Sequence, residues 1–485
     1  MEYSGSSYET RLNVGGDSRS SKVTFRIVDI IPAIAITSFA VVWITGVSRA
    51  NFWADDFIFL TSFNQNVGNL LGTDVTLGRI TVNVFFFLVS TIFGISSPLP
   101  FNLFSALILF AGIGVFLKVG KDLGLWTRRS ALWILSSTLA TGVFYPSIFT
   151  PGMINHNAAF LFLSLAVFFE LRSSIEARFK VRMFLTLLSG ISWLFILVTN
   201  PLYVGLLPLG ISMILHTWNL SSVLCNGKYK LEFLAKNLLY LVLPLAHFLL
   251  VSRPVTTKSS AYSDYGPQFV TNNLKIYQEL LAPNVIFVLS YGLVFTFAHL
   301  IAFYTCLRKF YLPGVLLLCA DSIIVLVLVQ GQQVFIQYWI MPSFLLFSSM
   351  ACGLESFVFR KNRAYRPILL IVLTCLIVLL PSGTNMSRYF SQEPWGYKLG
   401  QFRNEIASIV PVNSKLCVEF STSEASKNYF LGGMAWSSGF VAPPIAAASV
   451  DFPANNSCQS SNSIIGIRIS NGLNGDYDFS VKKLN

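Results

Sequence analysis

The chain has 485 residues, of which 54% are hydrophobic and only 12% are charged. A water-soluble protein of this length needs far more charge to cover its surface. The apolar residues come in blocks of about 15 to 23 residues, which is the length that spans a bilayer core of about 30 Å. The composition therefore excludes an ordinary soluble enzyme and predicts an all-α polytopic membrane protein.

The net charge of +12 could indicate a nucleic-acid partner, but its distribution excludes one. Most of the 34 Lys and Arg residues cluster at alternate ends of the apolar blocks. The positive-inside rule places such clusters in the cytoplasm, so the excess charge reports membrane topology. The clusters are Arg11 to Arg26, Lys118 to Arg129, Arg172 to Arg182, Lys228 to Lys236, Arg308 with Lys309, and Arg360 to Arg366.

Hydropathy read against these clusters predicts about eleven transmembrane helices. We expect no cleaved signal peptide, because residues 1–25 are polar and the first apolar run is long enough to stay in the membrane. The predicted spans lie near 28–48, 101–118, 130–146, 156–171, 183–199, 203–217, 237–252, 284–306, 312–330, 337–356 and 367–381.

One further apolar stretch, residues 79–100, is predicted to be a juxtamembrane or re-entrant element rather than a span. If it crossed the membrane, every later basic cluster would face outward. We expect it to break at Gly94 and the following Ser-Ser-Pro-Leu-Pro, since proline ends helices. This parity predicts a cytoplasmic tail over 1–27, a membrane domain over 28–381 and an outer domain over 382–485.

The outer tail is rich in Ser, Asn and Gly, as a water-exposed domain would be. A helical pattern over 397–409 and strand-like segments over 415–420 and 464–470 predict a small α/β unit. Cys417 and Cys458 are the two cysteines of this tail. An oxidising compartment would let them pair as a disulfide, and two free thiols are the alternative.

The outer loop over 49–100 contains two adjacent carboxylates, Asp55 and Asp56, directly after the first span. Carboxylates beside hydrocarbon are costly, so a functional role is one explanation for them. The alternative is that they mark where water begins, beside an interfacial tryptophan, Trp53. The loop ends in Gly78-Arg79, which holds an arginine over the membrane surface next to the apolar 79–100 stretch.

This layout of a first span, an outer Asp-Asp loop, a Gly-Arg pair, many spans and an outer C-terminal domain resembles the GT-C membrane glycosyltransferases. Within them it is most similar to the phage-encoded serotype-converting glucosyltransferases of the Gtr group. The tryptophan that often precedes the Gly-Arg pair in these families is absent from residues 71–77.

The resemblance implies an inverting glucosyltransferase in the bacterial inner membrane. Glucose would pass from undecaprenyl-phosphate-glucose to a hydroxyl of lipid-linked O-antigen on the periplasmic side. Asp55 or Asp56 would remove the hydroxyl proton as a general base, with a weak preference for Asp55. Arg79 would bind the phosphate leaving group, or snorkel to the interface. The sequence indicates no certain cofactor and leaves open whether a divalent cation is needed.

Other outer-side polar residues are candidate substrate contacts, because aromatic and amide side chains suit sugar faces and hydroxyls. His156 sits at the mouth of a span, where capping a helix is its alternative role. A long outer loop over 253–283, whose alternative is a simple exposed loop, supplies four of the rest. A membrane exit near 331–339 supplies the other three. These residues are Arg253, Lys258, Tyr262, Tyr265, Gln332, Gln333 and Tyr338.

Asp321 lies in the middle of a predicted span, with no partner cation evident in the sequence. It is a proton site of a transporter or, as we expect, an aspartate protonated or hydrogen-bonded to a neighbouring helix. A lipid-linked saccharide flippase would carry paired charges in several spans and internal repeats, which the sequence lacks. A non-catalytic envelope scaffold would leave Asp55 and Asp56 without a role. No Cys/His cluster has the spacing of a metal site.

Overall fold

The computed structural model describes the helical bundle and most of the C-terminal domain. The described residues are 27–47, 50–52, 55–63, 80–140, 151–199, 201–224, 237–238, 242, 285–329, 340–355, 397–421, 427, 430–431, 434, 437–453, 457–458, 465–471 and 477–483. Most of them are helical, and the strands all lie in the C-terminal domain.

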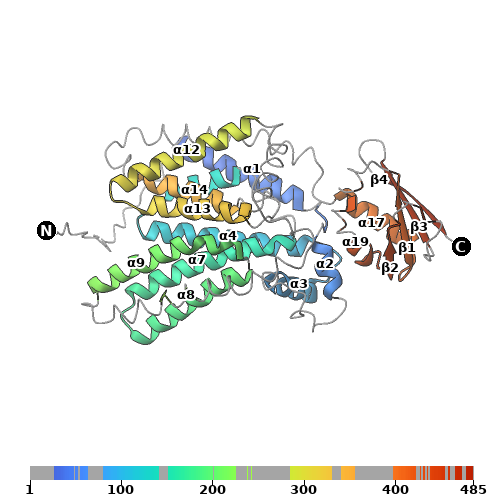
Figure 1. Ribbon diagram of the computed structural model, residues 1–485, viewed down its shortest axis with the longest axis horizontal. Helices are drawn as coiled ribbons and strands as arrows, with labels where there is room; N and C mark the ends of the chain where they lie inside the picture. Colours follow the sequence, from blue (N-terminus) through green and yellow to red (C-terminus); the bar gives the residue numbers. More distant parts are fainter. Residues whose placement is uncertain are drawn as a thin grey trace.

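Helices lie at each predicted span that the structure describes, whereas most of 237–252 and all of 367–381 lie outside the described residues. Figure 1 shows the long helices side by side as a bundle, with the C-terminal domain beyond one end. The bundle helices are α1 (Ile27–Val47), α4 (Leu99–Asp122), α5 (Arg128–Ala140), α7 (Ile154–Ile175), α8 (Phe179–Thr199), α9 (Leu207–Leu224), α12 (Val285–Leu307), α13 (Leu312–Val329) and α14 (Ile340–Gly353).

Three helical segments of the described chain are long and apolar enough to cross a membrane: Leu99–Asp122, Pro151–Ile175 and Phe179–Ile196. Shorter apolar segments occur in α1, α12, α13, α14 and a further helix, α3 (Ile80–Phe93). Large apolar side chains remain exposed on these helices, including Leu107 on α4, Phe184 on α8 and Phe303 on α12. Water would penalise such surfaces, whereas lipid tails would not, so the exposed faces are suited to a bilayer.

Two basic turns that the structure describes lie at the end of the bundle opposite the C-terminal domain. The turn between α7 and α8 holds Arg178, and the turn between α12 and α13 holds Arg308 and Lys309. In Figure 1 both turns are at the left, away from the sheet. This separation is what the sequence predicts for cytoplasmic basic loops and an outer domain.

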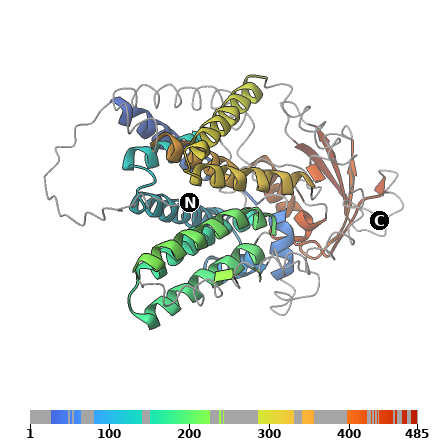
Figure 2. The same cartoon turned by 60° about the vertical axis from the view of Figure 1, so that its left-hand side comes forward.

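Two short helices, α2 (Asp55–Phe63) and α3 (Ile80–Phe93), lie at the bundle end nearest the C-terminal domain (Figures 1 and 2). With 14 residues, α3 is about 21 Å long and shorter than a bilayer core of about 30 Å. It ends at Gly94, whose φ of 74° is readily adopted by glycine. The break at Gly94 predicted from the sequence is therefore present, and α4 starts at Leu99.

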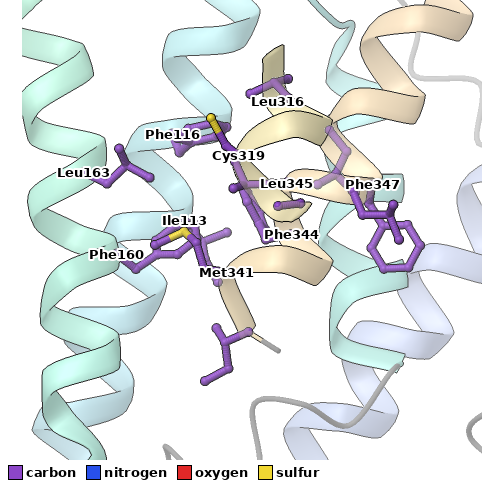
Figure 3. Close-up of a cluster of buried hydrophobic side chains, with 14 of the residues drawn as sticks. Ile113, Phe116, Phe160, Leu163, Leu316, Cys319, Met341, Phe344, Leu345 and Phe347 are labelled. Atoms are coloured by element: carbon purple, nitrogen blue, oxygen red, sulfur yellow. The ribbon is translucent and has the colours of Figure 1, made fainter. Parts of the chain in front are cut away.

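The core of the bundle is aromatic and joins α4, α7, α13 and α14. Phe344 of α14 lies against Phe116 of α4 and Phe160 of α7, with ring centroids 5.2 and 4.8 Å away. Figure 3 shows these rings together with Cys319 of α13 and Met341 of α14. Interlocked rings of this kind fix helices from distant parts of the chain in one arrangement.

Helices α4 and α7 run parallel and approach closely at Gly112. Ser105 of α4 pairs with Asn157 of α7, and Gly112 faces Leu161 further along both helices. A Cβ at Gly112 would come within 2.9 Å of the Leu161 backbone. A small residue at this crossing lets the two backbones pack, as in many membrane helix pairs.

The C-terminal domain is a four-stranded sheet with α17 (Tyr397–Ile409), which covers the helix predicted from the sequence, and the short α19 (Ser438–Val441). Its strands are β1 (Lys415–Phe420), β2 (Ser449–Asp451), β3 (Ile465–Asn471) and β4 (Tyr477–Lys483), in the order β2-β1-β3-β4. β1 is parallel to β2 and β3, and β3 is antiparallel to β4. Cys417 of β1 and Cys458 form a disulfide.

A second apolar cluster connects this domain to the bundle. It combines Phe57 of α2, Phe86 of α3 and Phe101 of α4 with Phe402 of α17 and the inner face of the sheet. Because one continuous core includes both parts, the domain is packed onto the end of the bundle. That packing determines the surroundings of α2.

The α4–α7 crossing can be tested with two alanine substitutions on the same helix. Gly112→Ala should lower the melting temperature of the protein in detergent, because its Cβ overlaps the Leu161 backbone; overpacking costs about 1–3 kcal/mol. Gly114→Ala is the control, since a Cβ there meets nothing within 4 Å. It should leave the melting temperature unchanged or raise it slightly, by helix propensity. Equal melting temperatures for the two variants would contradict the close crossing.

Candidate functional site

The adjacent carboxylates Asp55 and Asp56 open helix α2 at the bundle end that faces the C-terminal domain. The first turn of a helix presents unpaired backbone N–H groups, which favour negative charge there. Asp56 is fully buried, and its Oδ1 accepts a hydrogen bond of 2.5 Å from the backbone N–H of Gly152. The backbone of Asp55 is described, whereas its side chain lies outside the described part.

Gly152 belongs to the 3-10 turn η3 (Pro151–Met153), which leads directly into α7. A Cβ at this position would lie 2.9 Å from Asp56 Oδ1 and 3.4 Å from the ring of Phe59. A glycine is therefore what lets α2 come close enough for the hydrogen bond. The Pro-Gly pair ahead of a polar turn was the available signal for this residue, which the sequence analysis missed.

His156 lies one turn beyond Gly152, in the first turn of α7. Its Nδ1 is 2.8 Å from the hydroxyl oxygen of Tyr203, and both side chains are buried. Tyr203 lies in η4 (Pro201–Leu206), the 3-10 segment between α8 and α9. The predicted candidate His156 thus has a protein partner, and its contact with substrate stays a prediction. Tyr203 was missed, although an aromatic residue just after Asn-Pro at an outer helix end was a usable signal.

Further polar side chains join helices at the same end of the bundle. The Asn157 amide donates to Ser105 Oγ at 2.8 Å, which links α7 to α4. The hydroxyl oxygens of Thr81 and Thr199 are 2.9 Å apart and link α3 to α8. Hydrogen bonds between membrane helices fix their register, so this end of the bundle is held in one arrangement.

Asn102 on α4 is a buried amide that the sequence analysis also missed. Its side chain is fully buried, and neither amide atom has a hydrogen-bond partner in the part of the chain that the structure describes. Leaving a buried polar group unsatisfied costs about 1–3 kcal/mol. The position lies one turn before Ser105, so it belongs to the same polar end of α4.

Most other candidates named from the sequence lie outside the described residues, so their roles stay predictions. They are Arg79, Arg253, Lys258, Tyr262, Tyr265, Gln332, Gln333 and Tyr338. Within the described residues, no group of three or more His, Cys, Asp or Glu side chains could hold a metal ion.

The expectation that Asp321 lacks a basic partner is wrong. Its Oδ2 lies 3.1 Å from Nε2 of His299 on the neighbouring helix α12. The other ring nitrogen of His299 lies 2.8 Å from the carbonyl oxygen of Phe295. The two residues are brought together by the short α12–α13 turn, which hydropathy alone does not reveal. Hydrogen bonding to a neighbouring helix, the role expected for Asp321, is what the structure shows.

Comparisons with known proteins give a distant structural similarity. No family model matches the sequence, and no curated protein matches it. A crystal structure of ArnT from Cupriavidus metallidurans bound to undecaprenyl phosphate is similar over 90% of this chain and 92% of that chain, with 13% identity and a TM-score of 0.44. The apo structure of the same protein gives 12% identity and a TM-score of 0.42 over the same shares. Similarity at this level does not assign the chain to a family.

The close approach of α2 to η3 predicts that Gly152 tolerates no side chain. Gly152→Ala should weaken the contact with Asp56 and expose α2, because the added Cβ overlaps a carboxylate oxygen. Limited proteolysis near residues 55–63 measures this exposure, with Gly114→Ala as the control. We expect faster cleavage in Gly152→Ala and the wild-type rate in Gly114→Ala. The wild-type rate in both variants would show that α2 does not depend on this contact.

Proposed function

We propose that this chain is a membrane glycosyltransferase of GT-C type that uses a polyprenyl-phosphate-linked sugar as donor. One observation carries the proposal. The first turn of α2, which contains Asp55 and Asp56 and is called the acidic turn below, is held at the end of an apolar helical bundle, next to the C-terminal domain. Asp56 is fixed there by a hydrogen bond to Gly152. A costly carboxylate pair in this place has a clear use if a hydroxyl must be deprotonated next to a membrane-borne donor.

The two carboxylates have different roles in this proposal. Asp56 is buried and already accepts a backbone N–H, so it orients the start of α2. Asp55 is assigned as the general base that removes the proton from the acceptor hydroxyl. One ionised carboxylate is sufficient for the transfer reaction. No second carboxyl group is needed as a general acid, because the lipid phosphate leaves as a stable anion.

The phosphate leaving group needs cationic stabilisation, and we propose Arg79 for this role. Attack of the acceptor oxygen on the anomeric carbon forms the new glycosidic bond as the bond to the phosphate oxygen breaks. A single displacement of this kind inverts the anomeric configuration. The proton of the acceptor passes to Asp55, and the lipid phosphate is released.

We further propose that the sugar is glucose, carried by undecaprenyl phosphate, and that the acceptor is lipid-linked O-antigen in the periplasm. The resemblance to the Gtr group supports this finer assignment. Placement of the basic turns at the end opposite the C-terminal domain supports a periplasmic site in the inner membrane.

A lipid-linked saccharide transporter is the second candidate, and one observation favours it. His299 and Asp321 form an ionisable pair between two apolar helices, where transporters carry proton sites. The two candidates differ in product. A transferase adds one hexose per O-antigen repeat, which mass spectrometry of lipopolysaccharide from cells with and without the gene would detect, whereas a transporter leaves the repeat unchanged.

The assigned roles predict different effects of removing each charge. Asp55→Asn should lower kcat for glucosyl transfer from undecaprenyl-phosphate-glucose by about 10²–10⁴, the usual contribution of a general base. Asp56→Asn should cost about tenfold, because an amide oxygen still accepts from Gly152 while the charge is lost. Asp122→Asn is the control, since Asp122 is exposed and pairs with Lys118 at the far end of α4.

Wild-type transfer by both Asp55→Asn and Asp56→Asn would remove the carboxylates from the mechanism. The larger loss in Asp56→Asn would reverse the two roles. No transfer by the wild-type protein with this donor and acceptor would overturn the finer assignment.

A further inference from the structure

Arg403 is a buried cation in the C-terminal domain. It lies in the middle of α17 and is only 2% exposed. Its Nε donates to the carbonyl oxygen of Gly439 at 2.9 Å, and one terminal nitrogen donates to those of Ala442 and Pro443 at 3.0 and 2.6 Å. These three carbonyls belong to α19 and to the two residues that follow it, so the guanidinium is fixed within its own domain.

The face of this guanidinium lies on a residue of the bundle. Its Cζ is 4.2 Å from the ring centroid of Phe57, which is fully buried and directly follows Asp56 in α2. Cations over aromatic rings are attracted most strongly where water is excluded. Burial lowers the pKa of Arg403 to about 9, so the side chain still carries its charge at neutral pH.

Helix α17 also contacts the residues that precede the acidic turn. Gly400 of α17 packs against Asn51 so closely that a Cβ at this glycine would come within 1.6 Å of the Asn51 side-chain nitrogen. Gly400 and Arg403 are one turn apart on α17, whereas Asn51 precedes and Phe57 follows the two aspartates. Helix α17 thus contacts the chain on both sides of Asp55 and Asp56.

We infer that Arg403 is a positioning residue, through which the C-terminal domain holds the Asp55–Asp56 turn in its working orientation by contact with Phe57. The inference rests on the proposed role of these carboxylates. It deepens that proposal, because it makes the outer domain a part of the site rather than a cover over it. A misplacement of about 1 Å of a catalytic group can cost up to about 10²-fold in rate.

The experiment must separate this role from simple stabilisation of the domain. Arg403→Met removes both the cation and its three carbonyl bonds, so it can unfold the domain. Phe57→Leu keeps an apolar side chain in this buried position of α2, so it removes the cation–ring contact without removing the carbonyl bonds of Arg403. Arg468→Met is the matched control, because Arg468 is an exposed arginine of the same domain that pairs with Glu419.

We would measure kcat and KM for transfer from undecaprenyl-phosphate-glucose with full-length protein in nanodiscs. Amide hydrogen exchange would be followed separately in residues 55–63 of α2 and 397–409 of α17. Phe57→Leu should lower kcat by about tenfold and leave the donor KM within about threefold of wild type. Exchange should rise in α2 and stay at the wild-type rate in α17, and Arg468→Met should resemble the wild type.

The double variant tests whether the two residues act together. If Arg403 acts through Phe57, then Phe57→Leu combined with Arg403→Met should be no slower than the slower single variant. Multiplied losses, or wild-type kcat and α2 exchange in Phe57→Leu, would overturn the inference. If the wild-type protein transfers no glucose, the proposed function fails, and exchange in α2 still decides whether the contact positions the acidic turn.

Discussion

A carboxylate buried at the end of an apolar bundle must receive its hydrogen bonds from within the protein. Asp56 meets this requirement with the backbone N–H of Gly152, and that bond joins α2 to η3, the turn that leads into α7. Other contacts lie at the same end of the bundle. His156, one turn further along, is 2.8 Å from Tyr203 of η4, and α2 presents its apolar face to the C-terminal domain. The acidic turn is thus part of the framework as well as a candidate for chemistry.

The sequence predicted those features of the fold that depend on hydropathy, on the distribution of charge and on residues that end helices. Runs of apolar residues and alternating basic clusters predicted the bundle helices that the structure describes and the placement of two basic turns opposite the C-terminal domain. Gly94 and the prolines after it predicted the break between α3 and α4. Helix α17 was predicted from its periodicity, but β2 and β4 were not, since a three-residue strand and an edge strand with charged residues carry little signal.

The contacts that define the site were beyond sequence reasoning, because each joins residues far apart in the chain. At the site Asp56 meets Gly152 and His156 meets Tyr203, and away from it His299 meets Asp321. The sequence could predict some of the polar side chains at these contacts, such as His156. It could not predict the residues they contact, because pairing depends on which helices are neighbours and on their register. Glycines were the hardest to foresee, since Gly152 and Gly400 act by the space they leave.

The contact between Phe57 and Arg403 also has a consequence for the order in which the protein matures. During synthesis Phe57 leaves the ribosome long before Arg403, so early helices enter the membrane while the surroundings of the acidic turn are incomplete. In a nascent chain the contacts around Asp55 and Asp56 would therefore be complete only after the C-terminal domain has folded. Under the proposed function, newly synthesised protein would have no transferase activity until that domain has folded.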